Sequence, residues 1–171
     1  MKLILITLAA TTALLAQAPD MKSASGYART LQSTLRKNVE KAAEKMPEES
    51  YGFKPSHDVR SFGELLGHIA NAEYNMCAGV AAEKSPNTVN IEKDKKTKAE
   101  LTEALKGAFA YCEKVYAAAT DASATETVKY GNTDRNKLGL MWYNNTHTNE
   151  HYVNLVTYMR IRGFVPPSSE R

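Results

Sequence analysis

Residues 147–169, "HTNEHYVNLVTYMRIRGFVPPSS", contain two of the four histidines of the chain, and these two stand four positions apart. They continue the three- and four-residue spacing of Leu140 and Leu155, which marks one apolar face of a helix. His147 and His151 are therefore expected to point into the protein from the same helix. Side chains four residues apart lie on successive turns, so both imidazole rings can reach a common metal ion.

Helical spacing recurs in four segments of roughly 20 residues, which are separated by polar or proline-containing loops. Two of the segments begin with a capping-box sequence, Ser61 with Glu64 and Thr97 with Glu100, and the last segment ends at Gly163. The sequence therefore predicts an all-α domain over residues 19–171, folded as a four-helix bundle. Its helices are expected at about residues 23–46, 61–82, 97–119 and 137–162.

The same patterns predict which helix faces are buried and which segments are loops. In the first helix, the inward face is expected to start at Tyr27, to include Val39 and to continue to Met46. Residues 83–96 are polar and carry charges of both signs, so they are expected to form a solvated loop. No stretch alternates convincingly between apolar and polar residues, although Val128 and Tyr130 could be extended.

A third histidine, His68, shares a face of the second helix with Leu65 and can also point inward. Inward histidines on two helices permit a three-histidine metal site with open coordination positions, as a catalytic metal requires. Neutral imidazole suits zinc, nickel, copper or iron. Thr148 follows His147, where a zincin protease has glutamate, so that mechanism is disfavoured. The alternative is that the three histidines are hydrogen-bonded core residues that bind no metal.

Four asparagines lie close to the histidine faces and have two interpretations. They could orient the imidazole rings or bind a ligand, or they could form ordinary polar contacts between helices. These residues are Asn71, Asn75, Asn144 and Asn145. The fourth histidine, His57, lies in a proline-containing loop and is expected to be exposed to solvent.

The first 18 residues, "MKLILITLAATTALLAQA", have the pattern of a cleavable signal peptide. Lys2 is followed by an apolar run that is shorter than the roughly 20 residues needed to span a bilayer. The sequence therefore predicts export, to the periplasm or beyond, with no integral membrane segment after cleavage. Cys77 and Cys112 match no zinc-binding spacing. They could pair in an oxidising compartment or remain buried thiols.

The charge distribution gives no indication of a nucleic-acid partner. The net charge is only +3, and the lysines are scattered along the chain. Hydrophobic residues make up 43% and charged residues 24% of the sequence, which is typical of a soluble globular domain. The oligomeric state is not determined by these patterns, and a homodimer remains open.

Two motifs together resemble the DinB-like family of metal-binding four-helix bundles. "SFGELLGHIANAEYNMC" is similar to the second-helix motif of that family, and residues 147–169 are similar to its last helix. The resemblance extends over essentially the whole mature chain. It implies that His68, His147 and His151 are the three ligands of a divalent metal ion. Zinc or nickel is the expected ion, with iron and manganese as alternatives.

The resemblance also bears on function, because family members of known activity are largely thiol-dependent transferases or isomerases. The favoured interpretation is an exported metal-dependent enzyme, of the thiol-dependent transferase or hydrolase class, that acts on a small-molecule substrate. A signal peptide would place the chain where reduced thiols are scarce, which weighs against a thiol cofactor. The alternatives are a non-catalytic metal-binding or sensing protein, and a structural bundle without metal. No residue is identified as the general base.

Overall fold

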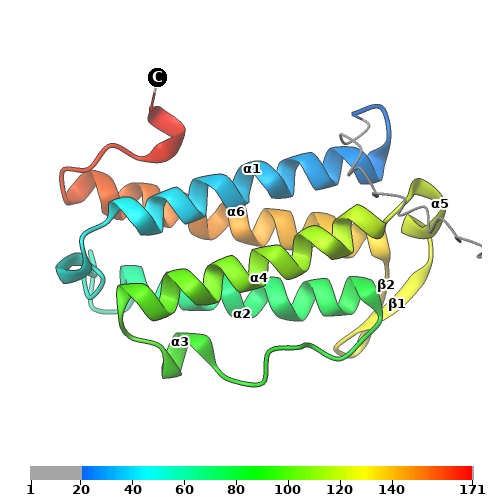
Figure 1. The fold of residues 1–171 in the computed structure, drawn as a ribbon, viewed down its shortest axis with the longest axis horizontal. Helices are drawn as coiled ribbons and strands as arrows, with labels where there is room; N and C mark the ends of the chain where they lie inside the picture. Colours follow the sequence, from blue (N-terminus) through cyan, green and yellow to red (C-terminus); the bar gives the residue numbers. More distant parts are fainter. Residues whose placement is uncertain (1–20, 171) are drawn as a thin grey trace, which may run out of the picture.

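The structure, a computed structural model, describes residues 21–170 and is mostly helical (Figure 1). Four long helices lie side by side along the length of the molecule and pack against one another. They are α1 (Ala24–Lys45), α2 (Phe62–Ala81), α4 (Lys98–Ala118) and α6 (Lys137–Ile161). The helical bundle expected from the sequence is therefore present. The signal peptide proposed for residues 1–18 lies outside the described residues.

The helices begin at the polar residues that the sequence indicated. Ser61 and Thr97 cap α2 and α4, and in each case the glutamate three residues later completes the capping box. These reciprocal hydrogen bonds satisfy backbone N–H groups that a helix start otherwise leaves without a partner. α6 begins after Asn136, whose side chain accepts a hydrogen bond from the amide of Gly139. The four long helices are therefore positioned by local sequence signals.

Several short elements in the loops were not expected from the sequence. They are the one-turn helices α3 (Ile91–Asp94) and α5 (Asp121–Ala124), and the 3-10 turns Glu48–Ser50 and Pro167–Ser169. Val128 and Tyr130, which the sequence allowed to be extended, lie in β1 (Thr127–Tyr130), and β1 pairs antiparallel with the unexpected strand β2 (Thr133–Asn136) in a hairpin. Gly131 and Asn132 connect its strands, and Gly131 has a φ of 61°. A two-residue turn of this kind is a hairpin signal, but the strands are too short to show clear alternation.

The inward face of α1 differs from the expected face at its start. Tyr27 is 49% exposed and stacks on Trp142, whereas Ala28 and Leu35 are buried. The expectation for Tyr27 was therefore wrong, and the expectation for Val39 was correct. The polar residue Gln32 lies on the buried face, and it obscures the apolar stripe that would have marked the right register.

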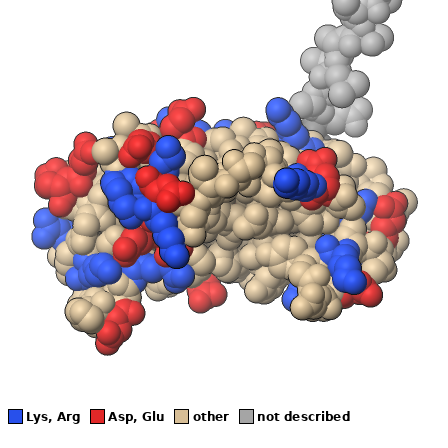
Figure 2. All heavy atoms as spheres, turned by 90° about the horizontal axis from the view of Figure 1, so that it is seen from below, with Lys and Arg blue, Asp and Glu red and all other residues tan. Residues whose placement is uncertain are grey.

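The outer surface shows no concentration of one sign of charge on the face seen in Figure 2. Basic and acidic side chains are intermixed there, and uncharged residues lie between the charged groups (Figure 2). Among residues 21–170, no helix combines the length and apolar character needed to cross a bilayer. The absence of a nucleic-acid partner stays a prediction.

Cys77 and Cys112 form a disulfide that joins α2 to α4. Their Cα atoms are 5.4 Å apart, and neither side chain is exposed to solvent. The sequence left open whether these residues pair, and the structure contains the bond. A disulfide of this kind is typical of proteins in oxidising compartments.

The carboxyl group of Glu73 is buried in the same part of the core. The backbone carbonyl oxygen of Glu73 lies 3.2 Å from Cys112 Sγ. The Thr148 hydroxyl donates to Glu73 Oε1 at 2.6 Å, and Asn144 Nδ2 donates to Oε2 at 3.1 Å. Burial raises the pKa of Glu73 to about 7, in spite of these two hydrogen bonds. Asn144 therefore makes an interhelical contact with α2 and does not orient an imidazole ring.

The wild type is expected to lose stability as the pH rises, and the Glu73→Gln variant is expected to lack this loss. The folded wild type keeps a proton on Glu73 that the unfolded chain releases, so its free energy of unfolding should fall as the pH rises from 4.5 to about 7. One pKa unit corresponds to about 1.4 kcal/mol, so the variant should gain roughly 1–3 kcal/mol on the wild type between about pH 5 and about pH 8. Urea unfolding of both proteins at the two pH values measures this gain. Equal pH dependence in both proteins would contradict the assignment.

Candidate metal centre

Three histidine side chains from two helices converge inside the bundle. His68 lies on α2, and His147 and His151 lie one turn apart on α6. The Nε2 atom of His147 is 3.2 Å from Nε2 of His68 and 3.1 Å from Nε2 of His151. One nitrogen from each ring lies within 4.8 Å of the others, and His151 is only 8% exposed. The structure thus brings together the three residues expected from the sequence.

These distances fit a shared metal ion. Nitrogen ligands of tetrahedral zinc lie about 2.0–2.1 Å from the ion, which places neighbouring nitrogens roughly 3.3 Å apart. The observed separations of 3.1 and 3.2 Å are close to this value. Without a cation, one proton on His147 Nε2 could bridge only one of the two contacts with good geometry. A cation at the centre is attracted by all three lone pairs, so the donor set suits a divalent metal.

Burial keeps the rings of α6 neutral, which is the form that binds metal. Burial, together with the nearby charges of His151 and His68, lowers the pKa of His147 to about 4. The pKa of His151 is also lowered to about 4, by burial and by the charges of His68 and Arg60. Both imidazoles are therefore uncharged at neutral pH and have a lone pair available for a ligand bond.

Glu92 orients His68 from outside the histidine cluster. Its Oε2 atom lies 3.1 Å from Nδ1 of His68, and its Oε1 atom accepts a hydrogen bond of 2.8 Å from Nε of Arg60. A proton on His68 Nδ1 is favoured by this carboxylate, and it leaves the Nε2 lone pair directed to the centre. Although burial acts to raise it, the contacts with Arg60 and His68 hold the pKa of Glu92 below its usual value. The sequence analysis missed this residue.

The α3 helix places Glu92 against α2 at a position where only glycine fits. A Cβ atom added to Gly67 would lie 2.6 Å from the Cα atom of Glu92 and 2.9 Å from its amide nitrogen. Asn71 then fixes the loop, because its Oδ1 accepts from the amide of Ile91 at 3.0 Å and its Nδ2 donates to Asn90. Gly67 and Asn71 thus control how close Glu92 comes to His68.

The other asparagines near the histidine faces, and the neighbouring Tyr152, do not form hydrogen bonds with the imidazole rings. Asn145 donates to the carbonyl of Ala28, and Asn75 is exposed on α2. Tyr152 Oη accepts from the amide of Ser168 near the C-terminus. Asn145 thus connects two helices and Tyr152 holds the C-terminal segment, whereas Asn75 makes no contact with the site. The side chain of His57 is 99% exposed, as expected.

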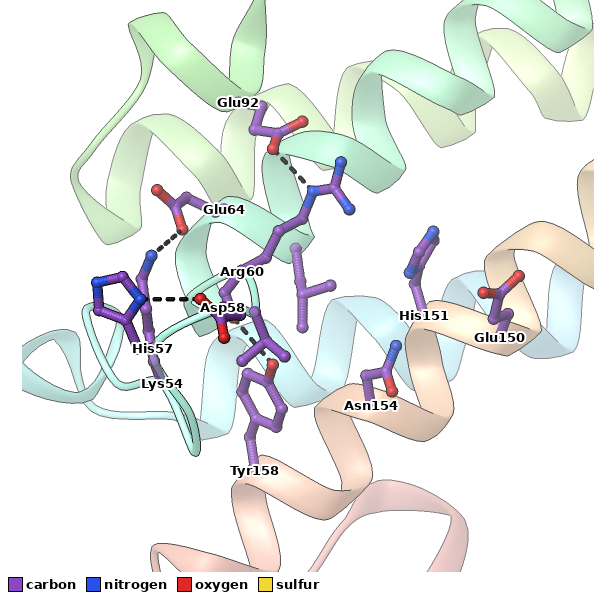
Figure 3. A pocket seen from close by; sticks show the side chains of 12 residues that line it. Lys54, His57, Asp58, Arg60, Glu64, Glu92, Glu150, His151, Asn154 and Tyr158 are labelled. Atoms are coloured by element: carbon purple, nitrogen blue, oxygen red, sulfur yellow. Dashed lines mark hydrogen bonds and ion pairs between the residues drawn. The ribbon is translucent and has the colours of Figure 1, made fainter.

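A cavity of about 650 Å³ opens beside His151 (Figure 3). The loop before α2 forms one wall with Lys54 and Arg60, and α6 forms another with Glu150 and Asn154. Most of the charged side chains that line the cavity form ion pairs with one another. Lys54 contacts Glu64 at 3.2 Å, Arg60 contacts Glu92 at 2.8 Å, and His57 contacts Asp58 at 2.9 Å. Of the three histidines, His151 lines this cavity, which is large enough for a small molecule.

Comparison with known proteins relates the chain to one family. The model of the DinB superfamily matches residues 33–153. A DinB-like protein from Bacillus cereus has a crystal structure with a TM-score of 0.73 at 13% identity, over 86% of this chain and 98% of that chain. A DinB-like protein from Bacillus subtilis has a TM-score of 0.69 at 19% identity, over 85% and 99%. No curated protein sequence matches the chain. The structural matches support the fold of the bundle.

Gly67→Ala is expected to weaken metal binding without touching a histidine. The added methyl group must push α3 away from α2, and Glu92 then loses its contact with His68. Loss of an outer carboxylate of this kind typically costs about 10–100-fold in metal affinity. Zinc affinity measured by chelator competition checks this value. Gly52→Ala is the matched control, because no atom lies within 4 Å of a Cβ added there. Equal affinities for the two variants would contradict the role assigned to Glu92.

Proposed function

The chain belongs to the DinB superfamily, and from this membership and the geometry of the three histidines we propose that it is an exported, metal-dependent enzyme acting on a small molecule. The observation that carries the proposal is the convergence of three Nε2 atoms beside a cavity that His151 lines. His68, His147 and His151 are the proposed ligands. Zinc or nickel is the proposed ion, because neutral imidazole suits these metals, and iron or manganese is the alternative.

Three protein ligands would leave at least one coordination position of the ion open, and this arrangement is typical of catalytic sites. When bound, the ion would supply Lewis acidity that lowers the pKa of a water molecule or thiol in an open position. His151 belongs to the histidine cluster and also lines the cavity, so a small molecule in the cavity would lie next to the proposed metal ligands. Leu65 adds an apolar wall beside them.

Glu150 is the proposed general base. It lines the cavity next to His151, and among the described carboxylates lining the cavity it alone has no ion-pair partner. The other three, Asp58, Glu64 and Glu92, are held by His57, Lys54 and Arg60. A carboxylate without a partner at the edge of the site can accept a proton from an attacking nucleophile.

The reaction class proposed is hydrolysis rather than thiol transfer. The buried disulfide between Cys77 and Cys112 and the leader pattern of residues 1–18 both support an oxidising, extracytoplasmic location. Reduced low-molecular-weight thiols are scarce in such a compartment, whereas water is always available. The thiol-dependent transferase is therefore the second candidate, favoured only by the family.

His147→Ala is expected to abolish stoichiometric metal binding and to leave the helices intact. The variant removes Nε2 of His147, which is the atom that lies close to both His68 Nε2 and His151 Nε2. Only two imidazoles, on different helices, then remain. Metal content of protein purified without a histidine tag, together with far-ultraviolet circular dichroism, measures both effects. His57→Ala removes an exposed histidine and should keep full metal content. A His147→Ala protein that retains its metal would refute the proposed ligand set.

Hydrolytic activity is tested by screening metal-loaded protein against esters and amides, with and without added thiol. Turnover without thiol is expected, and Glu150→Gln should lower kcat about 100-fold or more while metal content is unchanged. Turnover only in the presence of thiol would favour the transferase. Metal-loaded protein that is inactive on every substrate would favour a non-catalytic metal-binding or sensing protein.

A further inference from the structure

Arg60 presents unused hydrogen-bond donors to the cavity. Its Nε donates to Glu92, its side chain is 42% exposed, and it lines the cavity together with His151. Within residues 21–170, neither of its two Nη atoms makes a hydrogen bond or an ion pair. The guanidinium end that faces away from Nε is therefore free to bind a ligand.

The position of this guanidinium is fixed relative to the histidine cluster. Glu92 holds Nε of Arg60 with one oxygen and Nδ1 of His68 with the other. A single carboxylate thus links the arginine to a proposed metal ligand. In Figure 3, the guanidinium extends toward Glu92 and away from His57 and Lys54, with the His151 ring on its other side. A group that is held in place before binding loses little freedom when the ligand arrives.

We propose that the cavity selects substrates that carry a carboxylate, which Arg60 binds through its two Nη groups while another part of the same molecule reaches the three histidines. This inference rests on the proposed function and names its substrate class. The planar fork of arginine donates two parallel hydrogen bonds to the two oxygens of a carboxylate. With Nε already engaged by Glu92, the two Nη groups form the remaining fork.

The other charges of the cavity favour a singly charged carboxylate over a doubly charged phosphate. Asp58, Glu64 and Glu92 lie in the same cavity and would repel a second negative charge. Each of them already has a positively charged or imidazole partner, so they do not occupy the Nη atoms of Arg60. A carboxylate therefore forms the charged hydrogen bonds with Arg60 and is repelled less by these acidic side chains than a phosphate would be.

Ligand binding to cobalt(II)-loaded protein tests the inference without an assay of activity. The probes are succinic acid monohydroxamate, whose hydroxamate binds the metal ion and whose carboxylate is free, and its analogue with an amide in place of that carboxylate. The visible spectrum of cobalt reports the dissociation constant of each probe. The proteins are wild type, Arg60→Gln, and the control Lys93→Gln, which removes one positive charge from an exposed residue adjacent to Glu92 that does not line the cavity.

The carboxylate probe is expected to bind the wild type and Lys93→Gln at least about tenfold more tightly than the amide probe. In Arg60→Gln this ratio should fall to about one, with cobalt content unchanged. A ratio near one in the wild type, or an unchanged ratio in Arg60→Gln, would overturn the inference. Loss of cobalt from Arg60→Gln alone would also overturn it, because Arg60 would then act on the metal ion through Glu92. A wild type that binds no cobalt would refute the proposed function itself, before any probe is added.

Discussion

The close approach of three imidazole nitrogens is the constraint on which the rest of the site depends. Three lone pairs within a few ångströms repel one another unless a proton or a cation lies between them. One proton can bridge only one of the two short contacts well, whereas a divalent ion can accept electron density from all three lone pairs. The 3.2 Å separation between His68 and His147 is set by the packing of α2 against α6, and the 3.1 Å separation between His147 and His151 follows from their one-turn spacing on α6.

The loop between α2 and α4 completes this arrangement from outside the bundle. Gly67 allows α3 to lie directly on α2, and Asn71 ties the two together. Glu92 is then close enough to orient His68 on one side and Arg60 on the other. The one-turn helix α3 therefore orients both His68, a proposed metal ligand, and the guanidinium of Arg60, which faces the cavity.

Much of the bundle and the three histidines could be predicted from the sequence, because both follow from helical periodicity. His68, His147 and His151 stand on apolar stripes whose period is visible over several turns, and two capping boxes mark where helices begin. Glu92 could not be predicted in this way. It lies 24 residues from His68 in a segment of mixed charge, and its contact depends on the path of a loop that no periodicity describes. The start of the buried face of α1 was mistaken for a similar reason, since polar Gln32 occupies a core position. The disulfide of Cys77 and Cys112 depends on how α2 and α4 pack, so the sequence left it open.

X-ray absorption spectroscopy of the zinc-loaded protein tests the central claim most directly, because it reports the atoms that surround the ion. Three imidazole nitrogens are expected at about 2.0–2.1 Å from zinc, together with one or two oxygen ligands from solvent. A spectrum dominated by sulfur, or one that contains no more than one imidazole, would contradict the claim, since zinc would then be bound away from His68, His147 and His151.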